Sequence, residues 1–229
     1  YAITPKGATA DNYAITFVEG KLTVGKLTAA LAWNDYAERT YDGKASNVTA
    51  SVTNKIGNDD VTVTVTGGDA VNAGTYTAAV AGLAGDKAKN YQLPETGLSQ
   101  EYTINRAALT IASVAVEGKT YDGTTDAKVT SVTFNGLQNG EELVSGTDYT
   151  VAGVFDEADA GERTVTVTVT MRDTAKAKNY QLEKTTATAT TTITPVQTTL
   201  ELTAKDAVYT GLAYDAETKL TASANVENP

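Results

Sequence analysis

The chain has 229 residues with 18 basic and 28 acidic side chains, so its formal net charge is -10, and it contains no cysteine and no histidine. This composition excludes disulfide bonds, thiolate zinc sites and every mechanism that needs a cysteine or histidine side chain. The negative charge argues against a nucleic-acid partner, which requires clustered positive charge. No apolar run approaches the length of a membrane span, so we expect no membrane insertion in this segment.

Valine and threonine alternate along much of the chain, most clearly over residues 61–66 and 164–170. Side chains of a strand point alternately to its two faces, so this pattern places valines in a core and threonines in water. β-branched residues also favour a pleated sheet. No stretch has the apolar spacing of a helix, and the sequence therefore predicts an all-β chain.

Residues 1–26 are predicted to form a β-hairpin, the end of one β-unit within a longer protein. The first strand begins at Tyr13 after a turn at Asn12, and Glu19-Gly20 makes the hairpin turn before Lys21-Leu22. The apolar face of this hairpin consists of Tyr13, Ile15, Phe17, Leu22 and Val24.

Residues 27–107 and 108–196 are predicted to be two complete units, because the same motifs occur in both in the same order. Each unit has a Tyr-Asp-Gly tripeptide, then Ala-Gly, then Asn-Tyr. The spacing is about 80 to 90 residues, the size of one immunoglobulin-like sandwich. Residues 197–229 begin a further unit that is incomplete. The short joints without Gly/Ser tethers predict an elongated array.

The repeated tripeptide stands at Tyr41-Asp42-Gly43 and at Tyr121-Asp122-Gly123. Asp-Gly is a tight-turn dipeptide whose glycine can take a positive φ, and the preceding tyrosine can bury its ring. We therefore expect Tyr41 and Tyr121 to be largely buried at equivalent positions before equivalent turns.

The second repeated motif is Asn90-Tyr91 in the first complete unit and Asn179-Tyr180 in the second, each within the heptapeptide Lys-Ala-Lys-Asn-Tyr-Gln-Leu. Asparagine suits a turn with left-handed backbone, and a strand is expected to begin at each tyrosine. These residues and the Tyr-Asp-Gly tripeptides are predicted to be structural motifs of the repeat.

These motifs resemble two families of bacterial surface-protein repeats. Residues 12–24 are similar to the closing hairpin of MBG repeats, and residues 119–127 resemble the opening of YDG repeats, whose mid-repeat segment is similar to residues 155–167. Residues 27–107 are similar to both. The resemblance implies tandem immunoglobulin-like β-sandwich modules in an extracellular, adhesin-like protein of the cell surface, with no catalytic residues and no cofactor. The implied partners are other modules of the same chain.

Leu93-Pro94-Glu95-Thr96-Gly97 spells the pentapeptide at which sortases cleave wall-anchored proteins. A sorting signal continues with an apolar stretch and a basic tail, whereas here more than 130 residues follow Gly97 and the next ones are polar. The second heptapeptide copy continues without such a motif. We therefore interpret the match as a coincidence and expect a surface loop.

The chain contains residues of the types found in three other kinds of site. The carboxylates of one loop, Asp156, Glu157, Asp159 and Glu162, could bind calcium, but they lack the Asp-x-Asp-x-Asp-Gly spacing, so a solvated loop is favoured. No lysine lies in a clearly inward-facing pattern, which disfavours a Lys–Asn crosslink. Carboxylate pairs for glycoside hydrolysis have no distinguishing spacing. The chain is therefore not expected to be an enzyme, and no metal site is predicted.

The only tryptophan, Trp33, leaves one alternative open. A spacer uses features that recur in every unit, whereas a binding site uses features found in one unit. Trp33 lies near Tyr36 and has no counterpart in the second unit, so it is the candidate contact for a glycan or a host protein. The favoured interpretation is nevertheless a core tryptophan on an early strand.

An elongated array predicts a radius of gyration well above the roughly 17 Å expected for a compact globule of this length. Small-angle X-ray scattering in solution measures it directly. A value near that of the globule would contradict the expectation of stiff joints between successive units.

Overall fold

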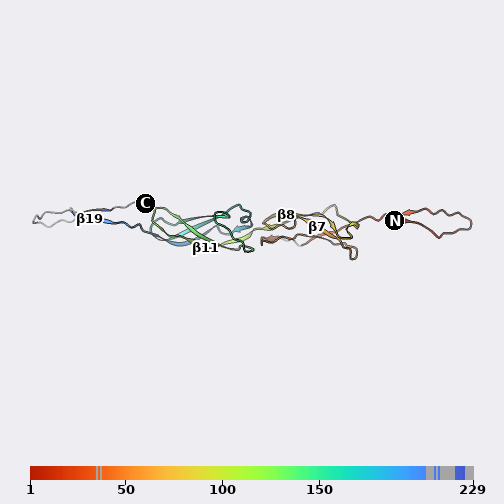
Figure 1. The fold of residues 1–229 in the computed structure, drawn as a ribbon, viewed down its shortest axis with the longest axis horizontal. Coiled ribbons are helices and arrows are strands. Elements are labelled where there is room, and N and C mark those ends of the chain that lie inside the picture. Colours follow the sequence, from red (N-terminus) through yellow and green to blue (C-terminus); the bar gives the residue numbers. More distant parts are fainter. Residues whose placement is uncertain (35, 37, 205–208, 210, 212–219, 225–229) are drawn as a thin grey trace. The chain divides into compact units, whose positions relative to one another are not determined.

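The computed structural model describes residues 1–34, 36, 38–204, 209, 211 and 220–224. Strands make up nearly all of its regular structure, and the helices among the described residues are two single-turn 3-10 helices, η1 (Ala88–Asn90) and η2 (Ala177–Asn179). The prediction of a β-rich chain is thus confirmed. The chain divides into two compact units, Tyr1–Arg106 and Ala107–Pro229 (Figure 1).

The first unit contains a four-stranded sheet in the order β5-β10-β8-β7 and three two-stranded pairs, β1-β2, β3-β9 and β4-β6. The pairs β5–β10 and β3–β9 are parallel, and the others are antiparallel. The strands are β1 (Ala2–Ile3), β2 (Gly20–Lys21), β3 (Leu27–Thr28), β4 (Leu31–Trp33), β5 (Arg39–Thr40), β6 (Ala50–Val52), β7 (Thr62–Thr66), β8 (Gly74–Ala84), β9 (Tyr91–Gln92) and β10 (Ser99–Asn105).

The core of the first unit lies between its four-stranded sheet and the strands β4 and β6. Val63 of β7 and Leu83 of β8 pack against a buried cluster that includes Val52 of β6 and Tyr91 of β9. The valines of β7 alternate with exposed threonines, as the period of two predicts.

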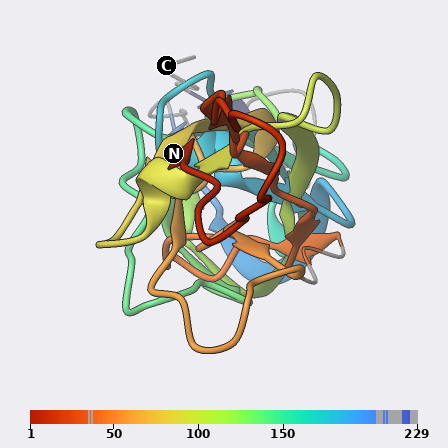
Figure 2. The ribbon, with the colours of Figure 1, turned by 90° about the vertical axis from the view of Figure 1, so that its right-hand side faces the viewer.

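Residues 1–26 differ from the expected hairpin. Glu19 and Gly20 do not form the expected hairpin turn. Gly20 instead pairs with Ile3 in the short ladder β1–β2. In Figures 1 and 2 this segment is an open red loop, whose two ends are joined by the β1–β2 ladder. Phe17 and Val18 lie outside the strands, and the apolar side chains of the segment are exposed. An isolated hairpin is marginally stable unless its apolar face is covered, and no described residue covers the apolar side chains of this segment.

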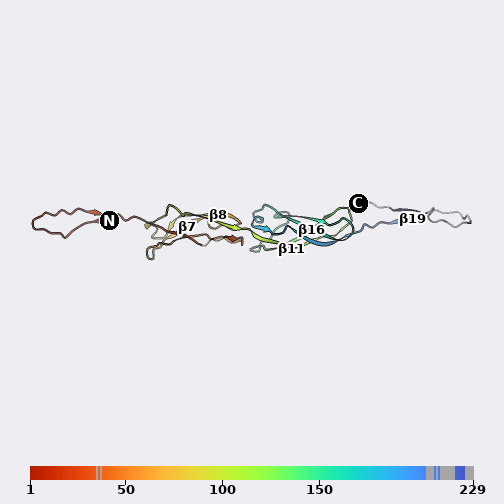
Figure 3. The same ribbon diagram turned by 180° about the vertical axis from the view of Figure 1, so that it is seen from behind.

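The second unit contains a five-stranded sheet in the order β12-β18-β16-β15-β13 and a three-stranded sheet in the order β14-β11-β17, with β11 and β16 labelled in Figure 3. The pairs β12–β18 and β11–β17 are parallel. The strands are β11 (Ala107–Val116), β12 (Lys119–Thr120), β13 (Asp126–Ala127), β14 (Val129–Asn135), β15 (Tyr149–Phe155), β16 (Gly161–Met171), β17 (Tyr180–Leu182) and β18 (Thr186–Thr194).

The two sheets of the second unit share one core. Val165, Val167 and Val169 of β16 are buried, and apolar side chains of the other sheet pack against them, among them Ile111 of β11 and Phe134 of β14. Phe134 also contacts the ring of Tyr149 edge-on, with 5.1 Å between the ring centroids. The alternation of valine and threonine in β16 therefore correctly predicts which face of this sheet is buried and which is exposed.

Beyond the second core, β19 (Leu200–Ala204) pairs with β20 (Leu220–Ala224) in an antiparallel ladder. Val208 lies outside the described residues, as do the side chains of Leu200 and Leu202. Tyr209 is exposed.

Replacing Val167 by alanine should lower the free energy of unfolding of the second unit by about 2 kcal/mol, because the fully buried side chain leaves a cavity. The control is Thr166→Val, which keeps a β-branched side chain on the exposed face and should change stability by about 0.5 kcal/mol or less. Urea unfolding measures both. Equal effects would contradict the assignment of the two faces.

Candidate functional site

Both Asn-Tyr motifs join a 3-10 helix to a short parallel strand. Tyr91 pairs with Leu27 where β9 meets β3, and Tyr180 pairs with Ala107 where β17 meets β11. Both tyrosines are buried, with exposed fractions of 3% and 2%. The two motifs thus occupy the same place in the strand pairing of their units.

The asparagines of these motifs lie in turns, as their residue type favours, but they do not enter the left-handed region. Asn90 and Asn179 end η1 and η2, and their N–H groups donate to the carbonyls of Lys87 and Lys176, both at 3.0 Å. Both asparagines therefore lie in right-handed 3-10 turns, and neither is among the described residues with a positive φ. Asn179 is buried, whereas Asn90 is exposed.

The hydroxyl group of Tyr91 is bonded to a turn that lies more than 30 residues earlier in the chain. It accepts a hydrogen bond from the N–H of Ile56 at 2.8 Å and donates one to Oδ2 of Asp59 at 2.9 Å. The turn is closed by the N–H of Asp59, which donates to the carbonyl of Ile56 at 3.1 Å. Gly57 has a φ of 56°, which a glycine adopts without strain.

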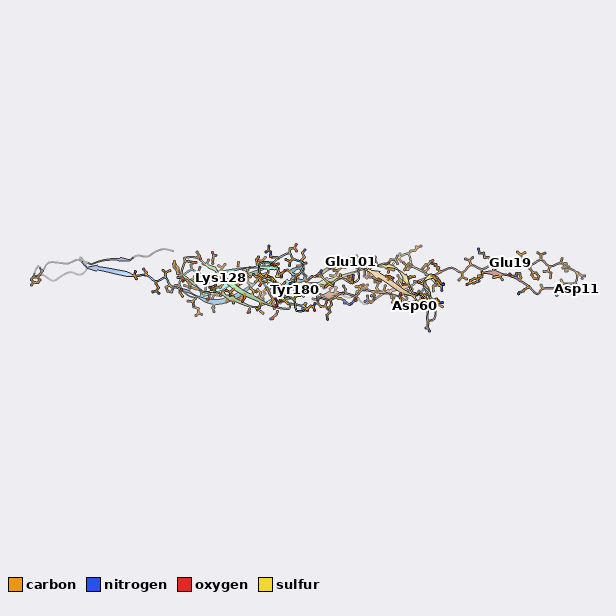
Figure 4. All side chains as sticks on the ribbon, viewed as in Figure 1. Asp11, Glu19, Asp60, Glu101, Lys128 and Tyr180 are labelled. Atoms are coloured by element: carbon orange, nitrogen blue, oxygen red, sulfur yellow. The ribbon has the colours of Figure 1, made fainter. Side chains whose placement is uncertain are left out.

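The hydroxyl group of Tyr180 makes the same set of bonds in the second unit, where Figure 4 labels this residue. It accepts from the N–H of Gln138 at 3.0 Å and donates to Oε2 of Glu141 at 2.7 Å. The N–H of Glu141 donates to the carbonyl of Gln138 at 2.9 Å. Asn139 occupies the position of Gly57, with a φ of 51°. We call each arrangement a tyrosine–turn contact.

The roles of Asp59 and Glu141 were not predicted from the sequence. The available signal was a turn, Ile-Gly-Asn-Asp in one unit and Gln-Asn-Gly-Glu in the other, with a carboxylate at its fourth position. Nothing in that signal identifies a tyrosine as the partner of the carboxylate.

Burial raises the pKa of Tyr180 to about 12; the Gln138 N–H bond opposes this rise and the Glu141 carboxylate adds to it. The N–H of Ile56 lowers the pKa of Tyr91, but burial and the Asp59 carboxylate outweigh it, so that pKa is also raised. Both phenols therefore remain protonated donors to the neighbouring carboxylates at neutral pH.

The Tyr-Asp-Gly tripeptides also have matching contacts. Tyr41 follows β5 and donates its N–H to the carbonyl of Asn105, and Tyr121 follows β12 and donates to Thr194, both at 2.8 Å. Gly43 has a φ of 74° and the corresponding glycine of the second unit has a φ of 73°. Tyr41 is buried, but Tyr121 is only partly buried, because it packs against the outside of the core cluster.

The aspartates of these tripeptides cap the turns that follow. Oδ1 of Asp42 accepts from the N–H of Lys44, and Oδ1 of Asp122 accepts from that of Thr124, both at 2.9 Å. The Nζ of Lys119 lies 2.7 Å from Oδ1 of Asp122. This cation, with the bonds from Thr124, lowers the pKa of the Asp122 carboxyl to about 2.

Leu93–Gly97 is part of the loop between β9 and β10, as the sequence predicts, and Glu95, Thr96 and Gly97 are exposed. Trp33 stands at the end of β4 and is partly buried, and its Nε1 donates to the carbonyl of Gly97 at 3.2 Å. The partly buried tryptophan is therefore bonded to this loop.

The acidic segment 156–162 is organised by an arginine. Nη1 of Arg163 lies 2.7 Å from Oε2 of Glu157, and its Nε donates to the carbonyl of Asp159 at 2.8 Å. Within the described part of the chain, no three side chains of the types Asp, Glu, His and Cys gather as metal ligands. Neither of the described helices is long and apolar enough to span a membrane.

Comparison with known families matches residues 105–189 to the YDG domain. This range contains the Tyr121 tripeptide, the Tyr180 motif and most of the strands of the second core. No curated protein and no solved structure matches the chain.

Tyr180→Phe should lower the stability of the second unit by about 1–3 kcal/mol, because the Gln138 N–H and the Glu141 carboxylate lose their buried partner. The control is Tyr149→Phe, a second buried tyrosine, for whose hydroxyl the structure shows no bond to any described residue; a change of about 0.5 kcal/mol or less is expected. Urea unfolding at neutral pH measures both.

The raised pKa also predicts how this stability depends on pH. A tyrosine of the unfolded chain ionises near pH 10, so the contribution of Tyr180 is complete below about pH 10 and is lost as pH rises through about 12. Tyr180→Phe should therefore reduce the loss of stability over this interval. The same loss in both proteins would contradict the role of the phenol.

Proposed function

We propose that this chain is part of a non-catalytic stalk in a large bacterial cell-surface or secreted protein of the adhesin type. In this proposal the two units are tandem immunoglobulin-like β-sandwich repeats that space or present a binding region located elsewhere. Residues 1–26 are the end of an MBG-like repeat, and residues 197–229 are the N-terminal part of another repeat. The partners of each unit are then its neighbours in the same chain.

The observation that carries this proposal is that the recurring residues make the same internal contacts in both units. Tyr91 and Tyr180 make the same hydrogen bonds to four-residue turns that are closed by the same main-chain bond, and the Tyr-Asp-Gly tripeptides follow equivalent parallel strands in both units. All these groups are engaged in internal contacts, so the repeated features stabilise the units and leave no free nucleophile–base pair among them. Repetition of a structural solution is what a spacer requires.

The strand pairing supports a role under tension. In the second unit, β12 pairs in parallel with the closing strand β18, with Lys119 opposite Ile193. In the first unit, β5 pairs in parallel with β10, with Arg39 opposite Ile104. Force applied at the two ends of a unit pulls such strands past each other, so all the hydrogen bonds of the pair share the load.

The match of residues 105–189 to the YDG domain supports an extracellular setting through the resemblance described above. The absence of cysteine and histidine and the charge of -10 are consistent with this setting. Anchoring of the whole protein to the cell wall is not assigned to any residue of this segment.

Ligand binding by the first unit is the second candidate function, and one observation favours it. Trp33 and Tyr36 have no counterparts in the second unit, and both are partly exposed. A glycan or a host protein could stack on such rings. A glycan array probed with the wild-type chain and with Trp33→Ala tests this. Binding that is lost in the variant would favour the binding module over the spacer.

Stretching single molecules by their two ends tests the spacer. We expect two separate unfolding events, each lengthening the chain by roughly 250 Å, since an extended residue spans about 3.4 Å. Tyr121→Pro removes the N–H that bonds to Thr194 and should lower the force of one event only. The control, Tyr121→Ala, removes the ring but keeps this bond. Unfolding in a single event, or at negligible force, would contradict the proposal.

A further inference from the structure

Two unusual features of the first unit are in contact with each other. Trp33 is the only tryptophan of the chain, and Leu93–Gly97 is its only sortase-type pentapeptide. They lie 64 positions apart and are joined by the hydrogen bond from Nε1 of Trp33 to the carbonyl of Gly97, at 3.2 Å. Gly97 has a φ of 76°, a conformation that favours glycine.

The pentapeptide is held at both ends as well. Before it, the carbonyl of Gln92 accepts a hydrogen bond from the N–H of Ala29 at 2.9 Å, and after it, the carbonyl of Leu98 accepts one from Val80 at 2.8 Å. Between these anchors, Leu93 and Pro94 are half-buried and the remaining three residues are exposed. The apolar half of the motif is thus turned partly into the unit.

We propose that Trp33 guards an internal cleavage site: the folded unit withholds Leu93–Gly97 from cysteine transpeptidases of the sortase class, and the segment becomes a substrate when the Trp33 contact opens. Such an enzyme reads the leucine and proline side chains and must bring the Thr96–Gly97 peptide bond into its own site. The Trp33 bond fixes the residue on the leaving side of that peptide bond. This protection of the segment does not depend on the function of the unit in the whole protein.

The reaction that the contact withholds is an acyl transfer without any redox change. The thiolate of the enzyme attacks the carbonyl carbon of Thr96, the bond to the nitrogen of Gly97 breaks, and this nitrogen leaves as an amine after accepting a proton. The amine of a second substrate, such as an oligoglycine, then attacks the thioester. A new amide forms at Thr96, and the thiolate is released.

The full chain is incubated with a sortase specific for Leu-Pro-x-Thr-Gly and with triglycine, beside a free peptide of residues 91–101. Mass spectrometry follows the two products, residues 1–96 carrying three glycines and residues 97–229. The folded chain should react at least about tenfold more slowly than the peptide, because the segment must first open locally. Reaction at the rate of the peptide would overturn the proposal.

Two variants remove the N–H donor of Trp33. The first is Trp33→Phe. The second replaces Trp33 by β-(3-benzothienyl)alanine, which keeps the shape of the ring and has sulfur in place of the N–H group. Both should react about fivefold faster than wild type, the factor that corresponds to the loss of one net hydrogen bond. The second variant decides the outcome if the first fails to fold. An unchanged rate in the benzothienyl protein would overturn the proposal.

The matched control is Val63→Ala, which weakens the core of the same unit at a residue outside the loop. Circular dichroism confirms that each protein is folded under the assay conditions. The control should react as slowly as wild type, because its loop contacts are intact. An acceleration equal to that of the Trp33 variants would show that cleavage follows unfolding of the whole unit, and the guard would be refuted.

Discussion

The hydroxyl group of a buried tyrosine connects the core of each unit to a turn at its surface. In each unit it accepts a main-chain N–H, from Ile56 or Gln138, and donates to a carboxylate. A buried phenol without partners costs free energy, and so does a turn that leaves its N–H unbonded. Core and turn therefore depend on each other. Among the described residues, every side-chain nitrogen or oxygen atom that is itself shielded from solvent has a hydrogen-bond partner.

The rest of each unit follows from the place where this tyrosine stands. It begins the strand that pairs in parallel with the opening strand, and the chain then continues into the closing strand, β10 or β18. The closing strand in turn holds the strand before the Tyr-Asp-Gly turn. The two ends of the unit are thus tied to its interior by short parallel pairs. This arrangement is consistent with the spacer proposed above, and it uses side chains that recur in both units.

Local patterns predicted the parts of this structure that depend on neighbouring residues. The alternation in β16 identified the buried valines, and the Asp-Gly dipeptides identified turns, because a strand face and a tight turn are properties of a few consecutive residues. The prediction of a turn at Glu19-Gly20 was wrong, because the register of a hairpin is decided by its partner strand. The contacts of Tyr91 with Asp59, of Tyr180 with Glu141 and of Trp33 with Gly97 could not be read from the sequence. They join residues 32, 39 and 64 positions apart, and only the folded chain brings them together.

Hydrogen exchange at two main-chain amides tests the central claim most directly. The amides of Ile56 and Gln138 lie in surface turns, where exchange is ordinarily fast, but each donates to a buried tyrosine hydroxyl. If the tyrosine–turn contact holds each unit together, both amides should be strongly protected and should exchange as slowly as amides of the core strands. Exchange of either amide as fast as that of Gly57, at the tip of the first turn, would contradict this account of the fold.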